Sequence, residues 1–180
     1  MEKFSVLLAD DHAIIRDGLK QILADTEDLV VVGEAANGSE VMQKVREKDC
    51  DVLVLDISMP GRSGLDLIHM IKAEKPELPI LILSMHHEEQ YAVRALHAGA
   101  SGYLTKESDG AVLVAAIRRV ASGGVYISEK VAELMVRGIR STNAPLPHNL
   151  LSDREYEVFN MLVTGLGLTE IGAKLSVSVK

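Results

Sequence analysis

Three aspartates and one lysine stand at or just past the ends of short, mainly apolar runs of the chain. The four residues are Asp10, Asp11, Asp56 and Lys106, and the runs that they follow are residues 4–9, 52–55 and 102–104. Short unbroken apolar runs are typical of strands that are buried on both faces of a parallel sheet. Because parallel strands end at the same edge of a sheet, where open α/β sheets bind ligands, we expect these side chains to converge.

Carboxylates held close together repel one another, and their pKa values rise unless a cation neutralises them. A hard divalent cation with oxygen ligands is the natural partner, and Mg²⁺ fits two or three carboxylates with open positions for water. A carboxylate can also attack phosphorus and form an aspartyl phosphate. Lys106 could offset the incoming negative charge, and Ser84, which ends another apolar run, could donate a hydrogen bond to a phosphoryl oxygen. We therefore interpret Asp56 as a nucleophilic carboxylate.

Five rounds of strand followed by helix precede residue 123. The predicted strands are residues 4–9, 29–32, 52–56, 80–84 and 102–104. Apolar side chains recur at helical spacing between them, and in the first helix these are Ile14, Ile15, Leu19, Ile22 and Leu23. Strands that alternate with helices indicate an α/β fold with a parallel, doubly wound sheet.

The pattern changes after Gly124, which predicts three parts of the chain. Residues 1–122 form the α/β domain, residues 123–150 a connecting helix and linker, and residues 151–180 a small all-α unit. Ser108 and Asp109 are predicted caps of the last α/β helix, and Ser152 to Glu155 has the pattern of a capping box. Thr169 is the predicted cap of a short helix near the end of the chain.

Charge and cysteine content limit the possible environments. Residues 1–120 hold 13 Lys and Arg against 20 Asp and Glu, whereas residues 121–180 hold six of each. An acidic first part does not resemble a nucleic-acid surface. Cys50 is the only cysteine, so no disulfide forms within the chain, and we expect a reducing, cytoplasmic location. We expect neither a signal peptide nor a membrane span.

The residues Asp10-Asp11, Asp56 to Gly61, Ser84 and Tyr103 to Lys106 together resemble the receiver domain of two-component response regulators. Residues 151–175 resemble the start of a LuxR-type helix-turn-helix. Together they indicate the NarL/FixJ family of response regulators. The resemblance implies a flavodoxin-like receiver followed by a partial helix-turn-helix.

The resemblance also implies roles for individual residues. Asp56 would accept a phosphoryl group from a sensor histidine kinase, and Lys106 would pair with that group. Mg²⁺ would be bound by Asp11, Asp56 and the backbone carbonyl of Ser58, with Asp10 helping through a water molecule. Ser84 and Tyr103 would form a switch pair, in which Tyr103 turns inward when the Ser84 hydroxyl moves toward the phosphoryl group.

The end of the chain departs from the family pattern. The recognition helix that would enter the DNA major groove follows the segment matching residues 176–180, so most DNA contacts are expected outside this chain. Ser178 and Lys180 are the candidate contacts within it. We expect the intact protein to control transcription by binding DNA and to form a homodimer on phosphorylation, whereas residues 1–180 alone should bind DNA poorly.

Two other functions use similar residues. An aspartate-nucleophile phosphatase or phosphotransferase would need a second acid two residues after the nucleophile, but Ser58 stands there and cannot act as a general acid or base. We therefore expect slow self-dephosphorylation and not enzymatic turnover. The third interpretation is a receiver that is never phosphorylated and acts as an interaction module. The complete set of acids, serine and lysine argues against it.

Overall fold

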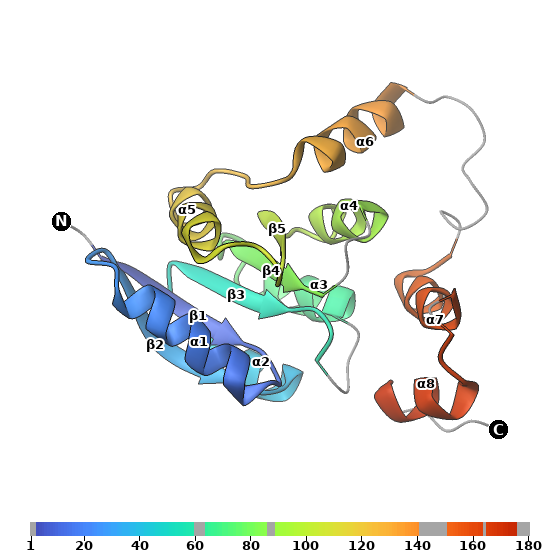
Figure 1. Cartoon of the computed structure of the whole chain (residues 1–180), viewed down its shortest axis with the longest axis horizontal. Coiled ribbons are helices and arrows are strands. Elements are labelled where there is room, and N and C mark those ends of the chain that lie inside the picture. The colour runs from blue at the N-terminus through green and yellow to red at the C-terminus, as the bar shows by residue number, and fades with distance from the viewer. Residues whose placement is uncertain (1–2, 60–63, 86–88, 141–150, 164, 176–180) are drawn as a thin grey trace.

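A five-stranded, all-parallel sheet forms the centre of the first 122 residues. The computed structural model describes residues 3–59, 64–85, 89–140, 151–163 and 165–175. The strands run in the spatial order β2-β1-β3-β4-β5 (Figure 1). They are β1 (Phe4–Ala9), β2 (Leu29–Ala35), β3 (Val52–Asp56), β4 (Ile80–Ser84) and β5 (Gly102–Thr105).

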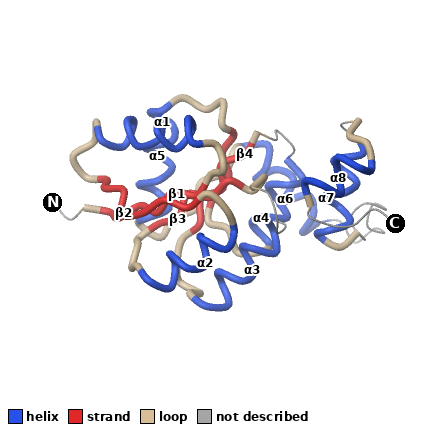
Figure 2. Tube along the Cα trace, turned by 90° about the horizontal axis from the view of Figure 1, so that it is seen from below, coloured by secondary structure: helices blue, strands red, loops and turns tan. Residues whose placement is uncertain are grey.

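Helices cover both faces of the sheet, as the sequence predicted (Figure 2). One face packs against α1 (Ala13–Ala24) and α5 (Gly110–Ala121). The other face packs against α2 (Gly38–Glu47), α3 (Gly64–Glu74) and α4 (Glu89–His97). Every residue of β3 and β4 is buried, which is why the four residues before Asp56 and the four before Ser84 are all apolar and show no alternation of polar and apolar residues. The predicted doubly wound α/β fold is confirmed.

The register of the ladders aligns the ends of the central strands. Asp56 on β3 pairs with Leu83 on β4, and the next residue, Ser84, pairs with Thr105 on β5. The backbone N–H of Lys106 then donates to the carbonyl of Ser84 at 2.7 Å. The polar residues after β3, β4 and β5 are therefore held at one edge of the sheet by backbone pairing.

Strand β2 is longer than predicted, because it continues through Gly33 to Ala35. The pairing register with β1 shifts between Val6 and Leu7, so that Leu7 lies opposite Gly33. A Cβ atom at position 33 would lie 3.0 Å from Leu7 Cδ1, so glycine gives the irregular pairing the space it needs. We had interpreted this glycine as the end of the strand, and that was wrong.

Of two predicted helix caps, Asp109 has the predicted position without the capping bond, and Thr169 was wrong. Asp109 occupies the position before α5, but its side chain makes no capping hydrogen bond. Thr169 lies inside α8 (Leu168–Lys174), and Gly167 is the residue that precedes this helix. The Glu170 side chain accepts from the Gly167 backbone N–H at 2.9 Å, so the exposed N–H at this helix start is satisfied from within the first turn. Ile14, one of the apolar residues at helical spacing in α1, is 84% exposed.

The connecting helix packs against the α/β domain. After α5 the chain returns to the sheet, where Tyr126 forms a parallel bridge with Gly102 at the outer edge of β5. Helix α6 (Glu129–Arg140) then lies beside α4, and Val131 is buried there (Figure 1). Residues 125–131 are thus continuous with the packing of the first domain. The predicted linker at 141–150 lies outside the described residues.

Two helices follow, α7 (Asp153–Val163) and α8. The predicted capping box at the start of α7 is present: the Ser152 backbone N–H donates to Glu155 Oε2 at 2.8 Å, and the Glu155 N–H donates to Ser152 Oγ at 3.4 Å. Tyr156 is buried against Tyr91 of α4, with ring centroids 6.0 Å apart. Among the described residues, no helix is both long and apolar enough to cross a bilayer.

Candidate functional site

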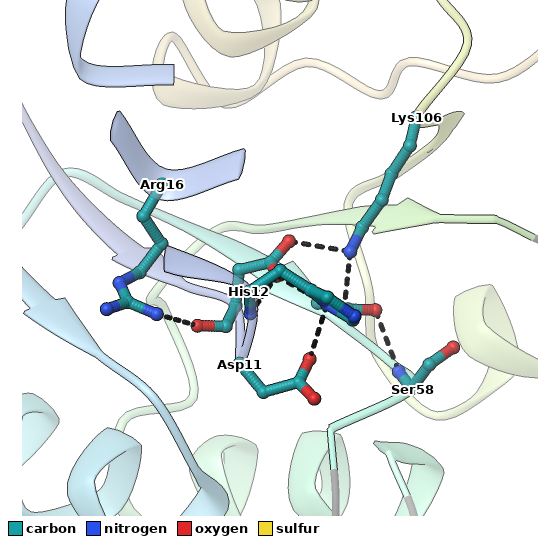
Figure 3. A network of polar contacts seen from close by, with 7 residues as sticks. Asp11, His12, Arg16, Ser58 and Lys106 are labelled. Carbon is teal, nitrogen blue, oxygen red and sulfur yellow. Dashed lines mark hydrogen bonds and ion pairs between the residues drawn. The ribbon is translucent and has the colours of Figure 1, made fainter. Parts of the chain in front are cut away.

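The predicted acidic residues and Lys106 lie at the carboxyl edge of the sheet, and Figure 3 shows Asp11, Ser58 and Lys106 close together there. Asp10 follows β1, Asp56 ends β3 and Lys106 follows β5. Each of the three side chains is at most 5% exposed. Lys106 Nζ lies 2.6 Å from Asp56 Oδ2 and 2.6 Å from Asp10 Oδ2. The three strands thus place two buried carboxylates around one buried ammonium group.

Burial changes the proton affinity of this group of residues. It raises the pKa of Asp56 above the ordinary value of 3.8, although Lys106 and the Ser58 backbone N–H, which donates to Asp56 Oδ1 at 2.8 Å, partly oppose the rise. Burial alone would lower the pKa of Lys106, but the hydrogen bonds and charges of Asp10 and Asp56 outweigh it, so that pKa is raised. The lysine therefore remains a cation at neutral pH.

The acids fit a divalent cation in number and position. Oxygen atoms of Asp10, Asp11 and Asp56 and a ring nitrogen of His12 all lie within 4.8 Å of one another. Asp11 Oδ1 is buried and accepts no hydrogen bond from any described residue. A buried carboxylate oxygen without a donor is costly unless a cation or an ordered water satisfies it. Three carboxylates against one lysine also leave an excess of negative charge, which a divalent cation would neutralise.

Arg16 holds the end of β1 in place. Its Nη1 donates to the backbone carbonyl of Asp10 at 2.6 Å, and its Nε lies 3.4 Å from Glu34 Oε2 on β2. Lys20 joins the same cluster through Glu34 Oε1 at 2.9 Å. The arginine therefore fixes the backbone that presents Asp10 and Asp11. Sequence reasoning missed it, because its only signal is a basic residue one helical turn into α1.

Ser84 and Tyr103, the predicted switch pair, lie on neighbouring strands and are both buried. Tyr103 is 7% exposed and borders a cavity of about 340 Å³. Residues of α4, β5 and the segment from Tyr126 to Val131 line the rest of this cavity. The Tyr103 backbone N–H also donates to the Tyr126 carbonyl at 3.0 Å. Tyr103 thus already lies inside in this structure, in contact with the connecting segment.

The other predicted site residues are Ser58, Ser178 and Lys180. Ser58 lies beside Asp56 and contributes its N–H, as described above. The candidate DNA contacts Ser178 and Lys180 lie outside the described residues. Sequence reasoning did not identify His12 as a candidate ligand, although its position directly after two acids was a usable signal.

Comparison with known proteins gives the same assignment. Residues 6–118 match the family model described as the response regulator receiver domain. The oxygen regulatory protein NreC of Staphylococcus haemolyticus (strain JCSC1435) is 40% identical over 184 residues, covering 97% of this chain and 84% of that protein. NreC of Staphylococcus aureus (strain JH9) is 41% identical over 182 residues, with the same shares covered.

Solved structures of response regulators resemble this chain both in the receiver part and in the C-terminal helices. A LuxR-family two-component response regulator from Aurantimonas sp. SI85-9A1 superposes with a TM-score of 0.71 and 34% identity, covering 78% of this chain and all of that one. RcsB of Salmonella enterica serovar Typhimurium, solved on the promoter P1flhDC with the phosphomimetic BeF3−, gives a TM-score of 0.72 at 28% identity, covering 98% and 85%. The chain therefore belongs to the two-component response regulators of the NarL/FixJ family, with a receiver domain followed by LuxR-type helices.

Proposed function

We propose that Asp56 is the phosphoryl acceptor of this response regulator and that its phosphorylation controls DNA binding by the C-terminal unit of the intact protein. The phosphoryl donor is a phosphohistidine on a sensor kinase. A carboxylate oxygen of Asp56 forms the new P–O bond while the P–N bond of the donor breaks and the histidine leaves. The observation that supports this best is the buried Asp56–Lys106 pair beside two further acids.

Each neighbouring residue has a defined task in this proposal. Asp11, Asp56 and the Ser58 carbonyl bind Mg²⁺, with Asp10 acting through a water molecule. The metal ion supplies positive charge that offsets the phosphoryl oxygens. Lys106, already 2.6 Å from Asp56, moves from the carboxylate to a phosphoryl oxygen, and the Ser84 hydroxyl donates to another.

Enzymatic turnover is not part of the proposal. Ser58 stands two residues after Asp56, where a phosphatase of the aspartate-nucleophile class would need an acid, and its N–H is bonded to Asp56. We infer slow hydrolysis of the aspartyl phosphate by water. The location that we propose is the cytoplasm, where kinase and DNA are both within reach.

Intact-mass spectrometry tests the acceptor directly. The chain is incubated with Mg²⁺ and acetyl phosphate, whose phosphoryl group transfers as acetate leaves, and then quenched rapidly. One added phosphoryl group is expected on the native chain, and none on Asp56→Asn or after chelation of the metal. Asp51→Asn is the matched control, because Asp51 is an exposed acid that pairs with Ser5 at the opposite end of β3. No adduct on the native chain would overturn the proposal in favour of an unphosphorylated interaction module.

We also propose how phosphorylation acts on the C-terminal unit. Receiver residues 1–122 and the unit at 151–180 are joined by residues 123–150, and α7 contacts α4 through Tyr156. Phosphorylation releases this contact and favours a homodimer. One solved relative is described as bound to a promoter together with a phosphomimetic. Light scattering with and without BeF3− should show a doubling of mass, and an unchanged mass would contradict the dimer.

A further inference from the structure

His12 lies against the acidic site in a way that the proposed Mg²⁺ chemistry does not use. Its Nδ1 is 3.0 Å from Asp11 Oδ1 and 3.3 Å from Asp10 Oδ1 (Figure 3). The contact with Asp11 lacks hydrogen-bond geometry, since that oxygen is buried and accepts no hydrogen bond within the described chain. A ring nitrogen and two carboxylate oxygens therefore meet at close range, and of the two oxygens Asp11 Oδ1 accepts no hydrogen bond from the described residues.

The spacing is that of ligands around one ion. Neighbouring ligands of an octahedral cation with bonds of about 2.1 Å lie about 3.0 Å apart. The His12–Asp11 and His12–Asp10 distances are 3.0 and 3.3 Å. Asp56, the fourth residue of the cluster, also has a ligand atom within 4.8 Å of the other three.

The local backbone explains why two consecutive side chains can face one point. On a strand or within a helix, adjacent side chains point in different directions. His12 precedes α1 in an extended conformation, with φ −89° and ψ 108°. Its backbone N–H donates to Asp10 Oδ1 at 2.8 Å, which folds residues 10–12 into a tight turn. The turn brings the imidazole over the carboxylates.

The imidazole is 66% exposed, whereas the Asp10 and Asp56 side chains are almost fully buried. It therefore stands at the solvent side of the acidic site, where an arriving hydrated ion would meet it first. Nitrogen donors are poor ligands for Mg²⁺ but good ligands for first-row transition metals, whose affinity rises from Mn²⁺ to Co²⁺ and beyond.

We propose that His12 is a nitrogen ligand of the divalent cation at this site, and that through it the site prefers a first-row transition-metal ion to Mg²⁺. The inference rests on the proposed phosphoryl-acceptor site and extends it to metal selectivity. Mg²⁺ would be bound by the oxygen ligands alone, and a transition-metal ion would gain the His12 Nδ1 bond in addition.

Pulsed electron paramagnetic resonance of the Mn²⁺-loaded chain tests the ligand. A ¹⁴N modulation is expected for the native chain and for His97→Gln, a control at the exposed end of α4, but not for His12→Gln. Labelling with ¹⁵N-histidine should replace the ¹⁴N pattern. Absence of nitrogen modulation in the native chain, or its persistence in His12→Gln, would overturn the assignment.

Calorimetric titration tests the selectivity on the same variants. His12→Gln should weaken Co²⁺ binding by about tenfold or more and Mg²⁺ binding by less than about threefold. Equal losses for both ions would mean that His12 only organises the turn, and would overturn the proposal. Far-UV circular dichroism confirms that the variant is folded.

The experiments distinguish failure of the His12 ligand proposal from failure of the phosphoryl-acceptor proposal. If the native chain forms the acetyl-phosphate adduct with Mg²⁺ but shows no nitrogen modulation with Mn²⁺, only the role of His12 is wrong. If the native chain forms no adduct, the phosphoryl-acceptor function is wrong, whatever the metal spectrum shows.

Discussion

Lys106 is bonded to two buried carboxylates at once, so its removal should be costly. Lys106→Met would leave Asp10 and Asp56 without a cation, and uncompensated buried charge of this kind costs about 3 kcal/mol of unfolding free energy. Urea unfolding in the presence of a chelator measures the loss. The same substitution in an Asp56→Asn background should cost clearly less, because fewer charges remain unpaired. An equal loss of unfolding free energy in both backgrounds would show that Lys106 and Asp56 are not energetically coupled.

The raised pKa of Asp56 predicts a pH dependence of stability with a definite sign. Between the ordinary carboxyl pKa of 3.8 and the raised value, the folded chain keeps a proton that the unfolded chain has lost. Unfolding then releases protons, so the contribution of Asp56 to stability falls as pH rises through this window. Above it, the whole cost of the buried charge is present.

Comparison with Asp56→Asn isolates this contribution. Without divalent cations, the stability of the variant relative to the native chain should increase from pH 4 to pH 7. Thermal or urea unfolding across that range is the measurement. A difference that is constant, or that shrinks with rising pH, would mean that Lys106 compensates the buried charge fully.

At the scale of the elements, two glycines should respond oppositely to alanine. A Cβ at Gly102 would lie 2.8 Å from Leu81 Cδ1 and 2.9 Å from the Tyr126 carbonyl oxygen, so Gly102→Ala must displace the connecting segment from β5. We expect a loss of about 1–3 kcal/mol in unfolding free energy. Gly18 lies within α1 with open space around it, so Gly18→Ala should gain up to about 1 kcal/mol from helix propensity. Loss of stability in both variants would contradict the steric explanation.

The contact between α4 and α7 is a second test at this scale. The Arg94 guanidinium stacks 4.1 Å from the Tyr156 ring centroid, and its Nη2 donates to the Leu151 carbonyl at 3.0 Å. A cation–π contact of this partly buried kind is worth about 1–2 kcal/mol. Tyr156→Ala should therefore raise hydrogen exchange across α7, whereas Val163→Ala, at an exposed position, should not. Similar exchange in both variants would contradict docking through Tyr156.

The sequence predicted helices and strands well where a single residue pattern determines the local structure. Unbroken apolar runs predicted the five strands, and the polar residues after them predicted the composition of the site. The predictions at Gly33 and Thr169 were wrong, because an irregular strand pairing depends on a neighbouring strand and a helix start depends on which of several nearby polar groups satisfies the first N–H groups. Sequence patterns likewise did not identify Tyr156 as a buried residue of α7, since its burial depends on α4, a partner helix much earlier in the chain.

The whole molecule joins the acidic site to the C-terminal helices through shared packing. Tyr103 borders a cavity that α4 and the segment from Tyr126 to Val131 also line, and α4 bears the residues that contact α7. A rearrangement around Tyr103 would therefore reach both the connecting helix and the α7 contact. We expect BeF3− with Mg²⁺ to increase hydrogen exchange in residues 153–163, and to do so less in Tyr103→Ala. Unchanged exchange in the native chain would mean that the two units are not coupled.

The bridge between Gly102 and Tyr126 also bears on self-association. An edge strand with unpaired backbone groups is a template on which other chains can add strands and aggregate. Strand β5 is an edge of this sheet, but Tyr126 occupies part of its open side and bonds to the backbone of Ser101 and Tyr103. The chain thus shields this edge with its own segment. A shortened chain ending at residue 122 would keep the acidic site and lose this shield, and its greater tendency to aggregate would follow from backbone hydrogen bonding alone.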